Sequence, residues 1–148
     1  MIVTVNDGLS QSNCNIQHTV HERVDAASPA QSTTLILDEN EDILWNVNPD
    51  NNTLTKIDAV SNSYLKEITT GTHPVALAQD SLGNIWIANK DDATVQVYND
   101  VQGKIINTLK MPRASQPISL AISPDKKTVY VALFATGEVL QIKDENVL

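Results

Sequence analysis

A short apolar strand motif recurs at near-constant spacing along this 148-residue chain. The clearest copy is Ile85-Trp86-Ile87-Ala88-Asn89, which follows a glycine-containing turn and ends at an asparagine. Weaker copies surround three other anchor residues. The four anchors, Val3, Trp45, Trp86 and Tyr130, lie 42, 41 and 44 residues apart. Because a fixed period of about 40 residues is typical of repeat architectures, the sequence predicts an array of similar units.

Each repeat divides into short apolar stretches separated by turn residues. In the clearest unit, strands are expected at residues 75–78, 85–88, 94–98 and 104–109. Turns rich in Gly, Pro, Asn and Asp at intervals of about 8–12 residues, without helical periodicity, favour an all-β array. The chain is expected to form a single segment, 1–148, with units at 1–32 (partial), 33–73, 74–116 and 117–148 (partial).

The two outer units are expected to be incomplete. Aligned on the repeat, the first unit begins at its second strand, residues 2–5, with two poorly patterned strands to follow at 14–18 and 19–24. The last unit reaches Leu148 at the point where its fourth strand should begin. The expected architecture therefore has two complete units and two incomplete ones.

Two stretches carry a resemblance to a known family. They are Pro74-Val-Ala-Leu-Ala-Gln-Asp-Ser-Leu-Gly-Asn-Ile-Trp-Ile-Ala-Asn and Pro117-Ile-Ser-Leu-Ala-Ile-Ser-Pro-Asp-Lys-Lys-Thr-Val-Tyr-Val-Ala. The pattern resembles the YVTN-type β-propeller repeat, which is related to NHL and streptogramin-lyase-like propellers. The resemblance covers residues 33–148 well and 1–32 weakly, and it departs at 133–137, where the asparagine-led turn is missing. It implies four-stranded antiparallel blades whose Pro-led strand lines a central channel.

Two complete blades and two partial ones are too few to close a ring. Propellers contain about four to eight blades, and a short arc exposes the apolar faces of its end units. We therefore expect either a segment of a longer propeller or a subunit that completes its ring by self-association.

The composition of the chain excludes some classes of binding partner. Eighteen acidic and ten basic side chains give a net charge of −8, which repels nucleic-acid phosphates and anionic lipid. A single cysteine, Cys14, excludes an intrachain disulfide, and no apolar stretch approaches the roughly 18 residues of a membrane span. We expect a soluble chain without an export signal, although the resemblance implies a periplasmic, cell-surface or secreted location.

Two residues are candidate ligand-binding positions. His73 and Gln116 each precede the proline that opens a predicted innermost strand, Pro74 or Pro117, so both should lie at the mouth of the channel. Either side chain could contact a ligand there. The alternative is that each satisfies a carbonyl group of its own loop.

Other recurring residues are better explained by structure. Asn6, Asn48 and Asn89 end the anchor strands, which indicates turn chemistry rather than a ring of amides around a ligand. The acidic run 38–42 lacks the glycine and glutamate of an EF-hand and is expected to be a solvated turn. Trp45, Trp86 and Tyr130 are expected to pack between units, although a carbohydrate-stacking series has the same composition.

Two functions remain open from the sequence. The first is a non-catalytic binding or scaffold module that presents its channel face and loops to a protein or a small molecule. The second is part of a propeller enzyme of the streptogramin-lyase or lactonase type, to which His73 and Gln116 would contribute. No catalytic Ser/His/Asp order, phosphate loop or Cys/His metal spacing is present, so the sequence predicts no catalytic residue, no metal ligand and no cofactor.

Overall fold

The computed structural model describes residues 2–6, 11–15, 34–38, 40–124, 127–143 and 146–147, and every element in these ranges is a β-strand. Side chains are described within 34–143. The strands are β1 (Ile2–Asn6), β2 (Gln11–Asn15), β3 (Leu35–Leu37), β4 (Ile43–Asn48), β5 (Thr53–Asp58), β6 (Ser63–Thr69), β7 (Pro74–Gln79), β8 (Ile85–Asn89), β9 (Thr94–Asn99), β10 (Lys104–Lys110), β11 (Pro117–Ile122), β12 (Thr128–Leu133), β13 (Val139–Lys143) and β14 (Asn146–Val147).

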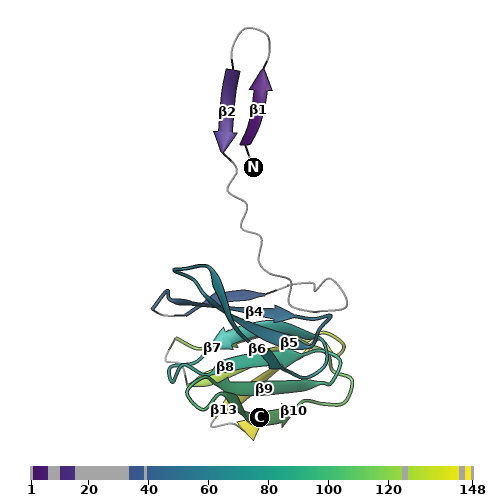
Figure 1. The fold of residues 1–148 in the computed structure, drawn as a ribbon. Helices are drawn as coiled ribbons and strands as arrows, with labels where there is room; N and C mark the ends of the chain where they lie inside the picture. The colour runs from purple at the N-terminus through teal and green to yellow at the C-terminus, as the bar shows by residue number, and fades with distance from the viewer. Residues whose placement is uncertain are drawn as a thin grey trace.

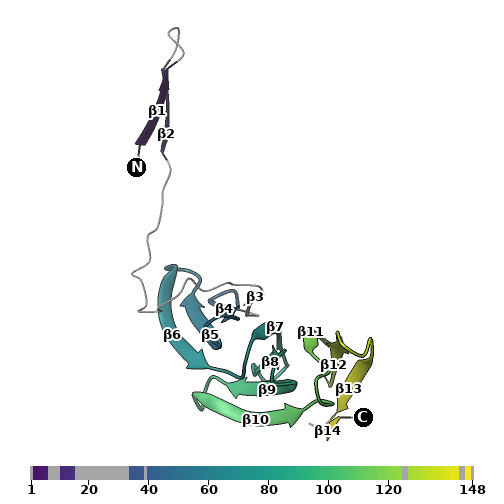
Figure 2. The same ribbon diagram turned by 90° about the vertical axis from the view of Figure 1, so that its right-hand side faces the viewer.

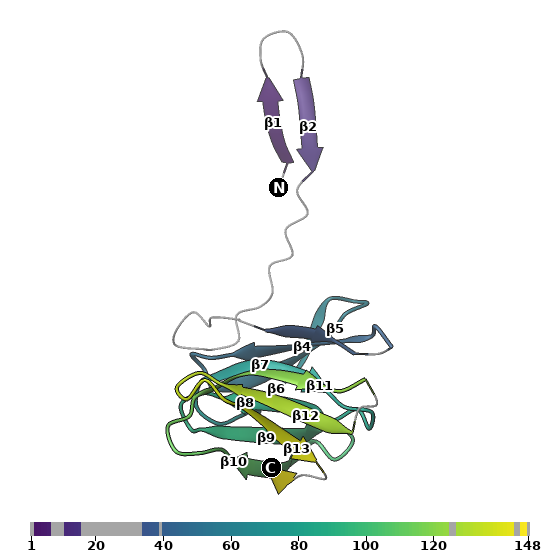
Figure 3. The same ribbon diagram turned by 180° about the vertical axis from the view of Figure 1, so that it is seen from behind.

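Twelve of these strands form three antiparallel four-stranded sheets in chain order. We call β3–β6 the first sheet, β7–β10 the middle sheet and β11–β14 the last sheet; β1 and β2 pair separately as a two-stranded sheet. The three sheets lie in layers in Figure 1, and Figure 3 shows β11 and β12 of the last sheet from behind. Seen along the layers, the sheets fan into an open arc, with β3, β7 and β11 innermost and β6, β10 and β14 outermost (Figure 2). An all-β fold built from four-stranded antiparallel sheets, as the repeat predicts, is confirmed.

The core consists of two apolar layers, one between each pair of adjacent sheets. Trp45 and Leu54 of the first sheet pack against Leu77, Ile87 and Tyr98 of the middle sheet. The Trp45 and Tyr98 rings meet edge to face with centroids 5.7 Å apart. Each fully buried apolar side chain of this size contributes about 1.5–3 kcal/mol to the free energy of unfolding, so the layers hold the arc together.

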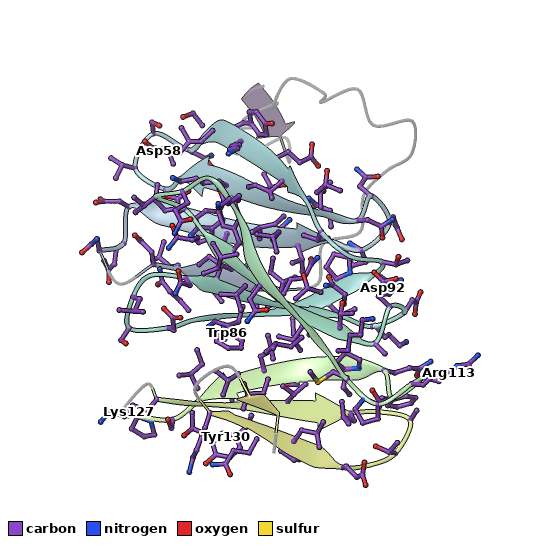
Figure 4. The ribbon with its side chains drawn as sticks, turned by 90° about the horizontal axis from the view of Figure 1, so that it is seen from below. Asp58, Trp86, Asp92, Arg113, Lys127 and Tyr130 are labelled. Carbon is purple, nitrogen blue, oxygen red and sulfur yellow. The ribbon has the colours of Figure 1, made fainter. Side chains whose placement is uncertain are left out.

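The second layer repeats the first, one sheet further along. Trp86 of β8 packs with Val95 and Val97 against Val129 and Ile142 of the last sheet, and Figure 4 shows Trp86 between those two sheets. The three aromatic anchors also hold one register. Each pairs with the inner strand of its own sheet, as Trp45↔Ile36, Trp86↔Ala78 and Tyr130↔Ala121. The predicted packing role is confirmed for Trp45 and Trp86, whereas Tyr130 lies on the opposite, uncovered side of the last sheet.

Polar side chains shape the turns that follow the inner strands. Asp38 accepts hydrogen bonds from the backbone N–H groups of Asp42 and Ile43, both at 2.9 Å. Asp80 does the same for Leu82 and Asn84 one repeat later. The acidic run is therefore a turn, as predicted, because its first carboxylate is occupied by its own backbone.

The strand-ending asparagines bridge their hairpins. Asn48 Nδ2 donates to Thr53 Oγ1 at 3.0 Å, and Asn89 Nδ2 donates to Thr94 Oγ1 at 3.1 Å. Each amide thus ties the end of one strand to the start of the next. The left-handed conformation lies further along each turn, at Asn52 (φ 58°) and at Ala93 (φ 51°). Turn chemistry is confirmed for these two asparagines, and the side chain of Asn6 lies outside the described residues.

The four strands of the middle sheet agree with their predicted bounds to within one residue at each end. The fourth strand of the last sheet, β14, comprises Asn146 and Val147. In the N-terminal unit, β1 matches the predicted strand at 2–5. Its partner β2 begins at Gln11 rather than at 14, because Gln11 already pairs with Asn6. The strand predicted at 19–24 lies outside the described residues.

A charged pair joins the first two sheets at their outer side. Lys56 Nζ lies 2.6 Å from Asp100 Oδ2 and 5.4 Å from the centroid of the Trp45 ring. The other oxygen of Asp100 accepts a hydrogen bond from the buried Tyr98 hydroxyl at 3.4 Å. Burial raises the pKa of Tyr98 above its ordinary value of 10.0, and the negative charge of Asp100 raises it further.

This raised pKa predicts a loss of stability in alkali. The unfolded chain ionises its tyrosines near pH 10 while the folded chain still holds the Tyr98 proton, so the free energy of unfolding should fall as pH rises above about 10. Asp100→Asn removes the second cause of the shift and should make the fall shallower without abolishing it. Urea unfolding from pH 8 to 11, with phenolate absorbance of the native protein, measures both. An equally steep fall in Asp100→Asn would contradict the assignment.

Candidate functional site at the channel mouth

The candidate site is built from paired loops at the start of the inner strands. In the middle sheet, Lys90 N–H donates to the His73 carbonyl at 2.9 Å, and Asp91 N–H donates to Thr72 at 3.3 Å. The next repeat uses the same two bonds, Phe134 N–H to Gln116 at 2.9 Å and Ala135 N–H to Ser115 at 3.1 Å. Each loop that leads into an inner strand is therefore clamped to the hairpin of its own sheet.

His73 and Gln116 occupy equivalent and unusual backbone conformations. Their φ angles are 56° and 55°, in the left-handed region that side-chain-bearing residues seldom adopt. Each is followed by a proline, and the ladder shifts register directly after Pro74 and after Pro117. Left-handed residues and irregular pairing next to a proline re-aim the side chain that precedes the strand. The two positions therefore correspond, as the repeat predicts.

The His73 side chain lies half-exposed just before the start of β7. Its backbone N–H donates to Asn52 Oδ1 of the first sheet at 2.8 Å, so the loop is held from both neighbouring sheets. Its Nδ1 lies 3.7 Å from Asp91 Oδ2, an ion pair when the imidazole is protonated. The backbone N–H and carbonyl of His73 are therefore both hydrogen-bonded, whereas its imidazole ring and the Asp91 carboxylate are accessible to solvent.

Gln116 is half-buried at the same place on the last sheet. Its carbonyl accepts the hydrogen bond from the Phe134 N–H, and its side-chain amide makes no hydrogen bond to another described residue. No hydrogen bond joins Gln116 to His73 in the described part of the chain.

Three further residues, Lys90, Asp91 and Phe134, belong to the candidate site, and the sequence analysis did not select them as site residues. Lys90 Nζ lies 5.8 Å from the centroid of the Phe134 ring. This contact joins a hairpin of the middle sheet to a hairpin of the last sheet. Phe134 is largely exposed although it is a large apolar side chain. The signal in the sequence was the departure at 133–137, where this phenylalanine replaces the usual asparagine-led turn. Asp91, which lies in the turn between β8 and β9, pairs with His73.

A cleft of about 470 Å³ adjoins these loops. Asp91 lines this cleft and also pairs with His73. Asp92 Oδ2 accepts the Thr72 N–H at 2.5 Å, whereas Lys110 and Arg113 make no hydrogen bond or ion pair with other described residues. Figure 4 shows Asp92 and Arg113 at the same end of the stacked sheets. The lining is Asp91, Asp92, Ala93, Thr94, Lys110, Met111, Arg113 and Ala114.

Neither a metal-binding cluster nor a membrane-spanning helix occurs in the described ranges. The described residues contain no group of three or more His, Cys, Asp or Glu side chains that could hold a metal ion. Within those ranges, no helix has the length and apolar character needed to cross a membrane.

Comparison with known proteins identifies the architecture. The sequence matches no protein-family model and no curated protein. Among solved structures, it is similar to virginiamycin B lyase from Staphylococcus aureus, with a TM-score of 0.72 and 15% identity over 99% of this chain and 47% of that one. It is also similar to the Cps50 (Swd1) β-propeller domain of Myceliophteria thermophila, with a TM-score of 0.67 and 16% identity over 79% and 39% of the two chains. The three sheets are β-propeller blades.

A third solved structure of different function is also similar. Hydrazine synthase of Kuenenia stuttgartiensis aligns with a TM-score of 0.70 and 25% identity, over 88% of this chain and 36% of that one. This chain therefore spans less than half the length of each of these three structures. Because the propeller fold carries unrelated activities, these likenesses establish the blades and their order but not a reaction.

Proposed function

We propose that this chain is a binding module whose channel-mouth loops present a preorganised polar and aromatic surface to a protein or small molecule. The proposal rests on the hydrogen bonds that fix the loops at the start of the inner strands. Two left-handed residues, His73 and Gln116, are held by hydrogen bonds to their backbone groups. The His73 ring stays half-exposed beside Asp91, and the Gln116 amide makes no hydrogen bond to another described residue. Loops that are rigid before a partner arrives lose less conformational entropy on binding.

The chemistry of the mouth supports a partner with both charge and an apolar surface. Phe134 supplies an exposed ring with the Lys90 ammonium beside it, and the His73–Asp91 pair supplies a donor and an acceptor. Aromatic side chains, phenylalanine among them, are enriched in protein interfaces, and a few buried anchors carry most of the binding energy there. The adjoining cleft adds two cationic side chains, Lys110 and Arg113.

A propeller enzyme is the second candidate. Its specific support is the half-exposed imidazole beside a carboxylate, His73 and Asp91, because such a pair can hold or move a proton. The similarity to virginiamycin B lyase is a likeness of fold. If the chain contributes to a catalytic centre, His73→Ala should abolish turnover; unchanged activity would remove His73 from that role.

Binding is tested by thermal shift with a panel of small molecules and peptides of both charge signs, followed by calorimetric titration of each hit. Phe134→Ala is expected to weaken a genuine mouth ligand by about tenfold or more, as for a central aromatic contact. Val101→Ala is the matched control, because Val101 is an exposed apolar residue in the turn between β9 and β10, away from the mouth. A panel without a hit, or hits insensitive to Phe134→Ala, would contradict the proposal.

A further inference from the structure

The connection from β10 to β11, residues 111–116, is longer than the connection from β6 to β7, residues 70–73. The two are otherwise equivalent. Each begins with a hydrogen bond of 2.9 Å to the hairpin of the blade that it leaves and ends with two bonds from the hairpin of the blade that it enters. The longer one, which we call the second connection, has two additional residues within 112–114. Binding residues concentrate in such surface connections, because the fold tolerates changes there.

The cleft described above lies where the second connection departs from its hairpin. In the shorter connection Asn52 spans this gap, because its Oδ1 accepts the His73 N–H at 2.8 Å. Ala93 holds the same turn position in the next blade, with a φ of 51° against 58° for Asn52, and its methyl group cannot make that bridge. The second connection instead bonds to itself, from Ser115 N–H to the Pro112 carbonyl at 3.1 Å. The space of about 470 Å³ lies between this connection and the Ala93 hairpin.

The two walls of the cleft carry opposite charges. Lys110 and Arg113 lie on the side of the second connection, and Asp91 and Asp92 lie on the hairpin. No ion pair joins these two walls in the described part of the chain. Lys110 takes the place of Thr69 in the preceding blade, since each pairs with the threonine that opens the third strand of its blade. Arg113 belongs to the longer segment, so the repeated fold requires neither cation.

The rest of the lining is apolar and held in place. Met111 and Ala93 are 6% and 7% exposed and belong to the apolar layer between the middle and last blades. Ala114, on the second connection, has a φ of 59°. Left-handed residues other than glycine persist where their surroundings hold them, and they gather at ligand sites. The cleft is therefore shaped before any ligand enters it.

We propose that this cleft binds a zwitterionic short peptide, with the peptide carboxylate on Arg113 and Lys110 and the peptide ammonium on Asp91 and Asp92. The inference rests on the proposed binding function and gives the cleft its own ligand class. A guanidinium donates two parallel hydrogen bonds to a carboxylate. A dianion would meet the two aspartates and a dication the two cations, whereas a zwitterion finds an opposite charge on each wall. The volume lies within the roughly 300–1,000 Å³ of small-molecule sites.

Titration of the full chain with the tripeptide alanyl-leucyl-alanine tests the site. Nuclear magnetic resonance shifts of the Ala93, Thr94 and Met111 amides should saturate with a Kd of about 1 mM or below. The same tripeptide with an amidated C-terminus, or with an acetylated N-terminus, should bind about tenfold more weakly, because each lacks one of the two charges. Free alanine carries both charges on a smaller body and should also bind about tenfold more weakly.

Variants that remove one charge locate each end of the peptide. Arg113→Gln and Lys110→Gln should each weaken the unmodified tripeptide by about tenfold, and together they should make its affinity equal to that of the amidated form. Asp91→Asn should weaken the unmodified tripeptide more than the acetylated one. Lys104→Gln is the matched control, because it removes the same charge at the opposite end of β10 and should change the affinity by less than about twofold.

Several results would overturn the proposal. Equal binding of the unmodified and amidated tripeptides would do so, as would an equal loss in Lys104→Gln, which indicates attraction to overall charge. Full affinity of the acetylated tripeptide would exclude a zwitterion site, and full affinity of free alanine would exclude a peptide site. So would unchanged shifts at about 10 mM tripeptide.

The proposal for the channel mouth is decided separately. Phe134 does not line the cleft, so Phe134→Ala should leave the affinity for the tripeptide unchanged. A cleft without tripeptide binding, together with other ligands that Phe134→Ala weakens, would overturn this inference and retain the mouth.

Discussion

Replacement of Trp86 by alanine is expected to lower the free energy of unfolding by about 3–5 kcal/mol, the range for deleting a large buried aromatic side chain. The Trp86 ring fills part of the apolar layer between the middle and last blades. Its loss leaves a cavity there, because two hydrogen-bonded sheets cannot easily shift to fill the space. The indole Nε1 also donates to Asp80 Oδ2 at 3.0 Å, and Asp80 shapes the turn before β8. Urea unfolding followed by circular dichroism measures the change.

Tyr130→Ala is the matched control for Trp86→Ala. It removes an aromatic residue from the same strand position, but from the uncovered side of the last blade, and should cost about 1 kcal/mol or less in the monomer. Equal losses for the two variants would contradict the assignment of Trp86 to an inter-blade layer.

The second large effect is expected at Gly71. A Cβ atom there would lie 2.6 Å from Asp92 Oδ2 and 2.7 Å from the Asn89 amide, and both side chains are already committed. Asp92 accepts the Thr72 N–H, and Asn89 bridges its hairpin to Thr94. Gly71→Ala should therefore lower the free energy of unfolding by about 1–3 kcal/mol, the cost of overpacking. It should also displace the loop that carries His73.

Gly83→Ala distinguishes steric crowding from backbone strain. Gly83 has a φ of 78° but open space where an added methyl group would lie, so its substitution should cost only the left-handed penalty of about 1–2 kcal/mol. Chemical denaturation reports both losses, and the nuclear magnetic resonance shift of the His73 ring reports the loop. An unmoved His73 resonance in folded Gly71→Ala would show that the crowding is absorbed elsewhere.

The strands and turns could be predicted because their causes are local. Alternation such as Thr94-Val95-Gln96-Val97 defines the faces of β9 before any partner is known. The repeat period then extended that interpretation to the less regular units on either side. The same reasoning was weakest in the N-terminal unit, where the pattern is poor and β2 begins three residues earlier than expected.

The candidate site could be predicted only in outline. The prolines placed His73 and Gln116 at equivalent positions at the mouth, since each precedes an inner strand. Their left-handed conformation could not be predicted, because it is held by hydrogen bonds with residues distant in sequence. His73 donates its N–H to Asn52, and the N–H groups of Lys90 and Phe134 donate to the carbonyls of His73 and Gln116. The contact of Lys90 with Phe134 joins two blades and has no signal in either hairpin alone.

By itself, the sequence determined the repeat, the all-β class and the order of strands within each unit, because alternation and turn chemistry act over a few residues. The tertiary structure decided which copy of each repeated position is buried. Trp86 and Tyr130 hold the same place in their sheets, yet only Trp86 has a blade packed over it. Burial depends on a neighbouring sheet, and no local pattern encodes whether that neighbour is present.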